Sequence, residues 1–283
     1  MNELRTHTIS FAGSTVALQY EGHEAVRIIE FLFRHIPTSE EQGVADVTYH
    51  LLSKGGVAEL RLGHRENEIH FRASEGEVAG YLLGRVCEAL ASHSTGGMVF
   101  HASALSWNGM GVMLPGTMEV GKSTLTAWLL SRGYDYLTDE MVYLPNGEAR
   151  LVGFPRPLNL RRSSRFVWQE LRGERTEEVW SGSDFDLVQP DWFPMTRVCS
   201  AAPLNLIIFP RYDLRATFAF EPLSKAQAGL ELMRHFVNAR NLPEAGFPRI
   251  AQLVRRVPAY RLRYARFEQI EGRIEARLAP ARG

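Results

Sequence analysis

Apolar residues recur along the chain with two periods, and these periods predict the order of its elements. Alternating or nearly alternating runs predict strands at residues 8–11, 15–19, 47–52, 57–62 and 68–71. Apolar positions at helical spacing predict helices at residues 24–35 and 75–92. The first two strands flank Gly13 and Ser14, which favours a hairpin. We interpret residues 1–95 as a small α/β accessory domain, in which no residues have the spacing of a catalytic or metal site.

Beyond a short polar segment at residues 92–97, the predicted linker, the pattern changes. Strands are predicted at residues 98–106, 110–114, 134–137, 141–144, 204–209 and 260–264. Helices are predicted at residues 122–131, 225–238 and 249–256. Residues 163–200 are polar, aromatic and irregular, and we expect a long loop or lid there. Because strand, loop, helix and strand follow in this order, residues 96–283 predict an α/β domain.

Composition narrows the class of protein. The chain has 283 residues, of which 45% are hydrophobic and 23% charged, the mixture of a globular protein. Its 32 basic residues balance 32 acidic ones, so nothing indicates a nucleic-acid or membrane partner. No apolar run reaches transmembrane length and the first residues lack a signal-peptide pattern, so we expect a cytoplasmic protein. Cys87 and Cys199 indicate neither a disulfide framework nor a metal site.

Residues Gly116 to Ser123 match the phosphate-binding motif G-x-x-x-x-G-K-[ST] at every fixed position. Glycines let such a loop curl so that its N–H groups meet phosphate oxygens, and the following helix directs its positive end at the same anion. Lys122 would reach the β- and γ-phosphates, and the Ser123 hydroxyl would bind Mg²⁺. The predicted nucleotide-binding residues are Gly116, Thr117, Met118, Glu119, Val120, Gly121, Lys122, Ser123 and Thr124. A strand–helix turn that binds nothing is the alternative.

Two details bear on this motif. Glu119 brings a negative charge to the loop, and we expect its carboxylate to face solvent. Only three of the 32 basic residues are lysine, at positions 54, 122 and 225, and Lys122 alone occupies a site where arginine would substitute poorly against phosphate.

An acidic pair, Asp139 and Glu140, begins 16 residues after Ser123, directly after a predicted strand. A P-loop enzyme holds its second metal-facing group at such a position. Two adjacent acids permit one to act as a base toward a hydroxyl and the other to orient Mg²⁺. A solvated acidic turn is the alternative. The motifs that mark GTPases, transporter ATPases and eukaryotic-type protein kinases are absent from the sequence.

These residues resemble the core of bacterial HPr kinase/phosphorylase and its kinase relatives. His101 precedes Gly116 by 15 residues, and Asp139 follows Lys122 by 17, as in that family. An Arg-Gly pair at Arg132 follows the P-loop helix in both. The resemblance implies a P-loop fold of the type shared with phosphoenolpyruvate carboxykinases and ATP-dependent phosphorylation of a serine hydroxyl.

The resemblance also implies roles for individual residues. Asp139 would accept the hydroxyl proton, Glu140 would help to hold Mg²⁺, and His101 would lie beside the phosphates. The second acid is usually aspartate in that family, so the longer Glu140 changes the metal geometry. For His101 a buried strand histidine is the alternative. Residues 153–161 are more similar to the HPr kinase-like relatives than to HPr kinase itself.

Arg156 lies between two prolines, which restrict its backbone, and could clamp a phosphate or a substrate carboxylate. A solvent-facing arginine is the alternative. We place the acceptor side at residues 163–200, at whose start Arg161, Arg162 and Arg165 lie.

The leading hypothesis is an ATP- and Mg²⁺-dependent kinase that phosphorylates a hydroxyl, above all serine, on a peptide, a protein or a small amino-acid-like molecule. A nucleotide-binding sensor or scaffold with little turnover is the second hypothesis, and a carboxykinase-like enzyme is the third. The sequence does not identify the phosphate acceptor. It also leaves open whether the protein forms a homo-oligomer.

Overall fold

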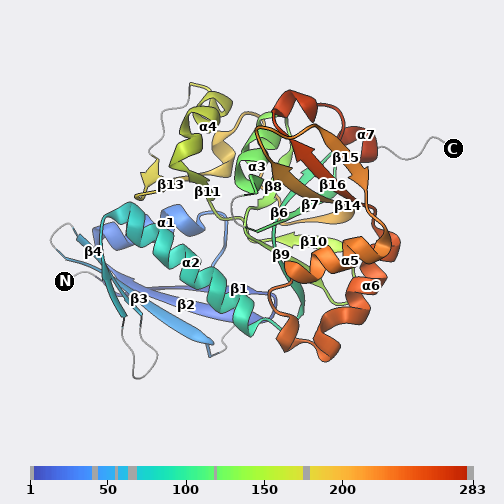
Figure 1. Cartoon of the computed structure of the whole chain (residues 1–283). Helices are drawn as coiled ribbons and strands as arrows, with labels where there is room; N and C mark the ends of the chain where they lie inside the picture. Colours follow the sequence, from blue (N-terminus) through green and yellow to red (C-terminus); the bar gives the residue numbers. More distant parts are fainter. Residues whose placement is uncertain are drawn as a thin grey trace.

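The computed structural model describes residues 3–39, 44–54, 57–62, 69–117, 120–174 and 179–278, and within residues 54–71 it describes the backbone alone. The fold is mixed α/β, with one five-stranded, one eight-stranded and one three-stranded sheet among these residues (Figure 1). The predicted α/β class is confirmed at this level, whereas the division at residue 95 stays a prediction.

The first sheet has the order β1-β2-β3-β4-β5. Its elements are β1 (Arg5–Phe11), β2 (Ser14–Glu21), α1 (His23–Phe33), β3 (Val47–Lys54), β4 (Val57–Leu62), β5 (Ile69–Arg72) and α2 (Glu75–His93). Strands β1 and β2 form the predicted hairpin, and β3 to β5 form an antiparallel meander. Because helix α1 connects β2 to β3, these two strands are parallel.

The eight-stranded sheet carries the segment Gly116 to Ser123, which holds the predicted phosphate-binding motif. Its strands are β6 (Gly97–Trp107), β7 (Met110–Pro115), β8 (Asp135–Thr138), β9 (Met141–Pro145), β10 (Arg150–Gly153), β14 (Ala201–Tyr212), β15 (Ala219–Pro222) and β16 (Ala259–Tyr264). Strands β7, β14 and β16 are mutually parallel neighbours, so their carboxyl ends meet at one edge. This edge is where ligands bind in open α/β sheets.

Both faces of this sheet are covered, which explains the continuous apolar runs of its central strands. On one face Leu114 and Ile208 pack with helix α3 (Lys122–Ser131). On the other face Met113 and Ile207 pack with helices α5 (Lys225–Arg234) and α6 (Phe247–Arg256), which lie on the far side of the sheet from α3 (Figure 1). A last short helix, α7 (Glu275–Leu278), packs through Leu278 on the α3 side.

Residues 163–200 are more regular than the expected loop or lid. They contain helix α4 (Arg165–Arg172) and strands β12 (Trp180–Ser181) and β13 (Phe185–Val188), and β13 pairs with β11 (Leu158–Arg161) in the third sheet. Single-turn helices lie at η1 (Arg162–Ser164), η2 (Pro190–Trp192), η3 (Ala239–Asn241), η4 (Pro243–Gly246) and η5 (Phe267–Gln269). The tryptophans Trp168, Trp180 and Trp192 are buried and anchor this region to its neighbours.

The segment expected to be a linker is held by hydrogen bonds. Ser94 is fully buried, and its carbonyl accepts from the side chains of Asn238 and Asn241 at 3.1 and 3.0 Å. The backbone nitrogen of Gly96 donates to the Ala12 carbonyl at 2.9 Å. Within the part of the chain that the structure describes, no helix has the length and apolar composition needed to cross a bilayer.

Candidate active site

The two glycines of the motif, at the start and near the end of the loop between β7 and α3, lie in close contact with their surroundings. Gly121 adopts a left-handed conformation (φ 88°) at the N-terminus of α3, and no side chain caps that end of the helix. A Cβ on Gly116 would lie 2.8 Å from Cγ2 of Val120, and one on Gly121 would lie 2.9 Å from Cβ of Tyr212. Glycine is therefore needed at both positions, and the uncapped first turn of α3 fits an anion. Met118 and Glu119, and with them the expected orientation of Glu119, lie outside the described residues.

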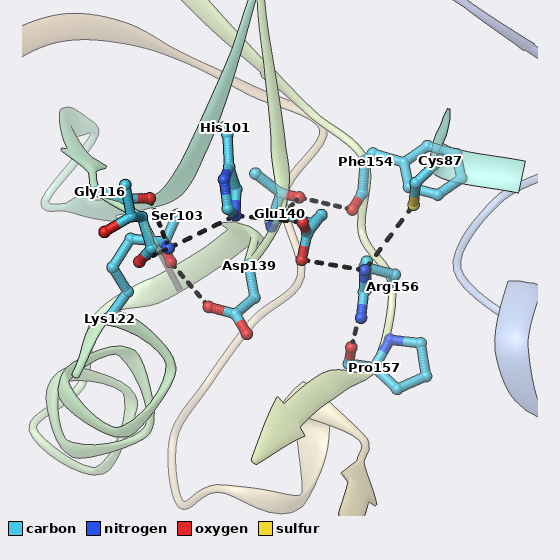
Figure 2. A network of polar contacts seen from close by, with 12 residues as sticks. Cys87, His101, Ser103, Gly116, Lys122, Asp139, Glu140, Phe154, Arg156 and Pro157 are labelled. Atoms are coloured by element: carbon cyan, nitrogen blue, oxygen red, sulfur yellow. Dashed lines mark hydrogen bonds and ion pairs between the residues drawn. The ribbon is translucent and has the colours of Figure 1, made fainter. Parts of the chain in front are cut away.

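Lys122 is folded back on this loop. Its Nζ donates to the carbonyl oxygens of Gly116 and Thr117 at 2.8 and 3.0 Å and lies 3.5 Å from Nε2 of His101 (Figure 2). Burial lowers the pKa of Lys122, while the carboxylates of Asp139 and Glu140 act in the opposite direction. The ammonium is thus held at the mouth of the loop, where it can reach an anion bound there.

Asp139 is buried directly after β8. Only 3% of it is exposed, and the Ser103 hydroxyl donates to its Oδ1 at 2.7 Å. Burial raises the pKa of Asp139, although hydrogen bonds from Ser103 and Ser123 and the charges of Arg156 and Lys122 work against this. The carboxylate is therefore a stronger base than an exposed aspartate. Its contact with Ser123 brings it to the N-terminus of α3.

Glu140 points away from Asp139 and contacts the side chains of His101 and Arg156. Its Oε1 lies 3.1 Å from Nε2 of His101, and its Oε2 lies 3.3 Å from a guanidinium nitrogen of Arg156 (Figure 2). Burial acts to raise the pKa of Glu140, but the hydrogen bond from His101 and the charges of Arg156, His101 and Lys122 outweigh it and lower the pKa to about 2. Glu140 is therefore ionised throughout the physiological pH range.

Arg156 is held by the protein on several sides. It is 4% exposed, and besides Glu140 its guanidinium donates to the Pro157 carbonyl at 3.2 Å and to Sγ of Cys87 at 3.8 Å. Tyr136 on β8 donates its hydroxyl to the Arg156 carbonyl at 2.7 Å, which fixes the backbone of this segment. The clamping role expected for Arg156 stays a prediction, since these contacts are made with protein groups.

Cys87 brings helix α2 into the site. The thiol is buried, and burial raises its pKa to about 11, so it is protonated at neutral pH. It lies beside Arg156 in Figure 2, on the side away from His101. No pattern in residues 1–92 marks α2 as part of a site, because its cavity-facing side chains are mostly small and carry no catalytic chemistry.

A cavity of about 870 Å³ joins these groups. From the predicted site it is lined by His101, Thr117, Gly121, Lys122, Ser123, Thr124, Asp139, Glu140 and Arg156. From helix α2 it is lined by Gly80, Gly84, Cys87, Glu88, Ala91 and Ser92. Tyr212 and Arg240 also line the cavity. Gly116 and Val120 instead line a second hollow, on the other side of the loop.

The expected acceptor side contributes only in part. Arg161, Ser163 and Ser164 line the cavity. Arg162 and Arg165 do not, and Arg165 forms an ion pair with Asp186. Most of residues 163–200 form the packed unit described above and do not line the cavity.

Two further residues next to the site were not predicted from the sequence. Ser103, which hydrogen-bonds Asp139, lies two residues after His101 on β6, so strand alternation could have found it. The backbone N–H of His101 donates to the carbonyl oxygen of His235 at 2.8 Å. His235 lies at the end of a helix that is distant in sequence from His101, so no local sequence pattern predicts this contact.

The residues present fit Mg²⁺ bound together with a nucleotide. Among the described residues there is no cluster of three His, Cys, Asp or Glu side chains that could hold a metal ion. Magnesium is usually held by one or two carboxylates and by substrate phosphates, with the remaining positions taken by water. The Ser123 hydroxyl and the carboxylates of Asp139 and Glu140 supply such a partial set on one wall of the cavity.

Comparisons with known proteins identify no family. No family model matches the sequence, and no curated protein matches it. Among solved structures, the HPr(Ser) kinase/phosphatase from Coxiella burnetii is similar over 64% of this chain and 93% of that chain, with 15% sequence identity and a TM-score of 0.30. This likeness is too distant to assign the chain to a family, so the proposal below depends on the geometry of the site.

Proposed function

We propose that the protein is an ATP- and Mg²⁺-dependent phosphotransferase that phosphorylates a hydroxyl group, above all serine, on a peptide, a protein or a small amino-acid-like acceptor. The observation that carries this proposal is the meeting of Lys122, Ser123 and Asp139 in one cavity at the end of a phosphate-type loop. The cavity of about 870 Å³ lies in the range of ligand pockets. The balanced charge of the chain argues against a nucleic-acid or membrane partner.

Each residue has a role in this reaction. The N–H groups at the start of α3 and the Lys122 ammonium bind the phosphates of ATP. The acceptor oxygen attacks the γ-phosphorus while the bond to the bridging β–γ oxygen breaks, so ADP leaves and the acceptor proton passes to Asp139. Ser123 and Glu140 would hold Mg²⁺, which neutralises charge on the phosphates when bound. Because Asp139 must be ionised to act, the rate falls as pH drops through its raised pKa.

Transfer of ³²P from γ-labelled ATP tests the proposal, with extract of cells lacking the protein and serine-bearing peptides as acceptors. We expect Lys122→Ala and Asp139→Asn each to lower transfer at least about a hundredfold. Lys225→Ala and Asp184→Asn are matched controls, because both side chains are exposed and neither lines the cavity, and both should retain wild-type transfer. Full transfer by Asp139→Asn would show that the base is another group.

One observation favours a second candidate, a nucleotide-binding sensor or scaffold. Both carboxylate oxygens of Glu140 already contact His101 and Arg156, which competes with metal binding. Nucleotide affinity and product formation measured on the same protein separate the two functions. ATP binding without transfer to any acceptor in the panel favours the sensor.

A further inference from the structure

A second hollow, of about 580 Å³, lies on the other side of the P-loop from Asp139. Its inner wall is formed by Pro115, Gly116, Thr117 and Val120 of the loop and the strand before it. Its outer wall is formed by the ends of β14 and β16, by Glu221 of β15 and by the C-terminal part of α5. Of the residues assigned to the proposed reaction or to nucleotide binding, only Gly116, Thr117 and Val120 of the loop line this hollow.

Arginines dominate the outer wall. The hollow is lined by Arg211, Arg234, Arg261 and Arg263 and by two carboxylates, Glu221 and Glu231. Among the described residues that line the hollow, positive side chains therefore outnumber negative ones by two. His235 also lines the hollow, and its pKa is lowered by burial, so it adds no charge at neutral pH.

One of the two carboxylates is ion-paired with two of these arginines, and the other lies directly across the sheet from one of the same two. Glu231 forms ion pairs with Arg234 and Arg261, each at 3.1 Å. Glu221 is the antiparallel register partner of Arg261, so the two side chains share one face of the sheet. The uncompensated charge thus lies on the other two arginines.

Arg211 and Arg263 lie side by side at the carboxyl edge of the sheet. They are register partners in the parallel pair of β14 and β16, and both are exposed. Among the residues that the structure describes, neither guanidinium has an ion-pair or hydrogen-bond partner. Asp213, in the adjoining hollow, accepts instead from the backbone nitrogen of Arg215 at 2.9 Å. Like charges at paired positions repel each other, and a shared anion would relieve this.

We infer that this hollow is a second anion site that binds a phosphate group, held by Arg211 and Arg263 and separate from the nucleotide. Two guanidinium groups can each offer a fork of N–H donors to phosphate oxygens, and together they match the charge of a phosphate dianion. The site lies at the carboxyl ends of parallel strands beside the P-loop, where ligands bind in such sheets. The ligand class is a small molecule carrying a phosphate monoester, and the inference does not depend on the proposed kinase activity.

Inorganic phosphate is the probe, titrated by calorimetry into Lys122→Ala protein, in which the loop's own phosphate site is weakened. We expect binding in this background, and at least about tenfold weaker binding when Arg211→Gln and Arg263→Gln are added. Arg255→Gln with Arg256→Gln on α6 is the matched control, because it removes the same charge at exposed positions outside the hollow, and it should change the affinity little. The thermal unfolding midpoint of each variant shows whether the fold is intact.

Three results would overturn the inference. Loss of all phosphate binding in Lys122→Ala alone would show that the loop is the only phosphate site. Equal weakening by the two double variants would show a general charge effect. Displacement of phosphate from wild-type protein by MgADP, with ADP affinity reduced by the Arg211 and Arg263 changes, would show that the arginines hold a phosphate of the nucleotide itself.

Discussion

The low pKa of Glu140 is caused mainly by two neighbouring side chains. His101 lies 3.1 Å from one carboxylate oxygen and Arg156 lies 3.3 Å from the other, and together with Lys122 they lower the pKa from 4.5 to about 2. A lowered pKa means that the ionised carboxylate stabilises the folded state. This contribution is complete above the unfolded pKa near 4.5 and is lost as pH falls toward about 2.

Replacing Glu140 by Gln should therefore destabilise the fold in a pH-dependent way. The buried Arg156 would lose its ionic partner, but the Glu140 side chain is 36% exposed, so solvent screening keeps the expected loss to about 1–2 kcal/mol at pH 7. At pH 3 the difference from wild type should shrink. Urea unfolding at both pH values measures this. Glu148→Gln, at an exposed ion pair with Arg150, is the control and should change stability by less than about 0.5 kcal/mol. An equal loss at both pH values would contradict the linkage.

Some of these side-chain contacts could be predicted from the sequence, and others could not. The resemblance to the HPr kinase family, carried by the spacing of His101, Lys122 and Asp139, implied that these side chains lie together, and all three line one cavity. The pairing of Glu140 with His101 and Arg156 was not predictable, because it depends on how the loop after β10 turns back toward β8. Two hydrogen bonds hold that loop: Tyr136 donates to the Arg156 carbonyl and Thr138 to the Phe154 carbonyl.

At the scale of elements, helix α2 is the part whose role the sequence did not reveal. Three of its glycines lie four residues apart and meet different surroundings. A Cβ on Gly76 would lie 2.1 Å from the Ser181 carbonyl oxygen, and one on Gly80 would lie 2.3 Å from the Phe185 ring. A Cβ on Gly84 would meet nothing within 4 Å, because Gly84 faces the cavity. The first two glycines let α2 approach the third sheet closely.

The same substitution at two of these glycines should have opposite effects. Gly76→Ala should destabilise the protein by about 1–3 kcal/mol, because backbone atoms must move to admit the methyl group. Gly84→Ala should stabilise it by about 0.5–1 kcal/mol, because alanine restricts the unfolded chain and enters open space. Urea unfolding of the two variants, which differ only in position on one helix, gives the comparison. Equal free energies of unfolding would show that α2 does not contact the third sheet as described.

The longer elements were predictable from their periods, and so were two four-residue strands, β5 and β8, whereas several other short strands were not. The helix expected at residues 122–131 has those bounds, and the strand expected at residues 57–62 likewise. Strands β10, β11 and β15 have four residues each and were missed. A run of four residues next to glycine or proline has no clear period, and pairing with strands from distant parts of the chain makes it a strand.

At the scale of the whole molecule, the N-terminal sheet shares its core with the rest of the chain. The cluster around Ile9, Ile28 and Leu82 also contains Val99, Met141, Phe154 and Leu187. Phe11 packs edge-on against Phe154 with ring centroids 5.4 Å apart, next to Arg156. The first 95 residues therefore contribute both to the packing under the site and, through α2, to the cavity wall.

A fragment of residues 96–283 should thus fail to form a stable site. Removing the N-terminal partners would expose the apolar side chains of Val99, Met141 and Phe154 and would open the cavity on its α2 side. We expect a broad thermal transition and binding of a hydrophobic dye, with nucleotide affinity below that of the full chain. Restoring cooperative unfolding by mixing in residues 1–95 would support a shared core. A sharp transition in the isolated fragment would instead establish two independent domains.

The sequence by itself determined the phosphate-type loop, the acidic pair and the α/β order, because each depends on residue types at short fixed spacings. Tertiary structure decided what surrounds them. It brought Cys87 to Arg156 across 69 positions and set Arg211 beside Arg263 through strand register. Such contacts follow from packing and pairing between distant segments, and local periodicity carries no information about them.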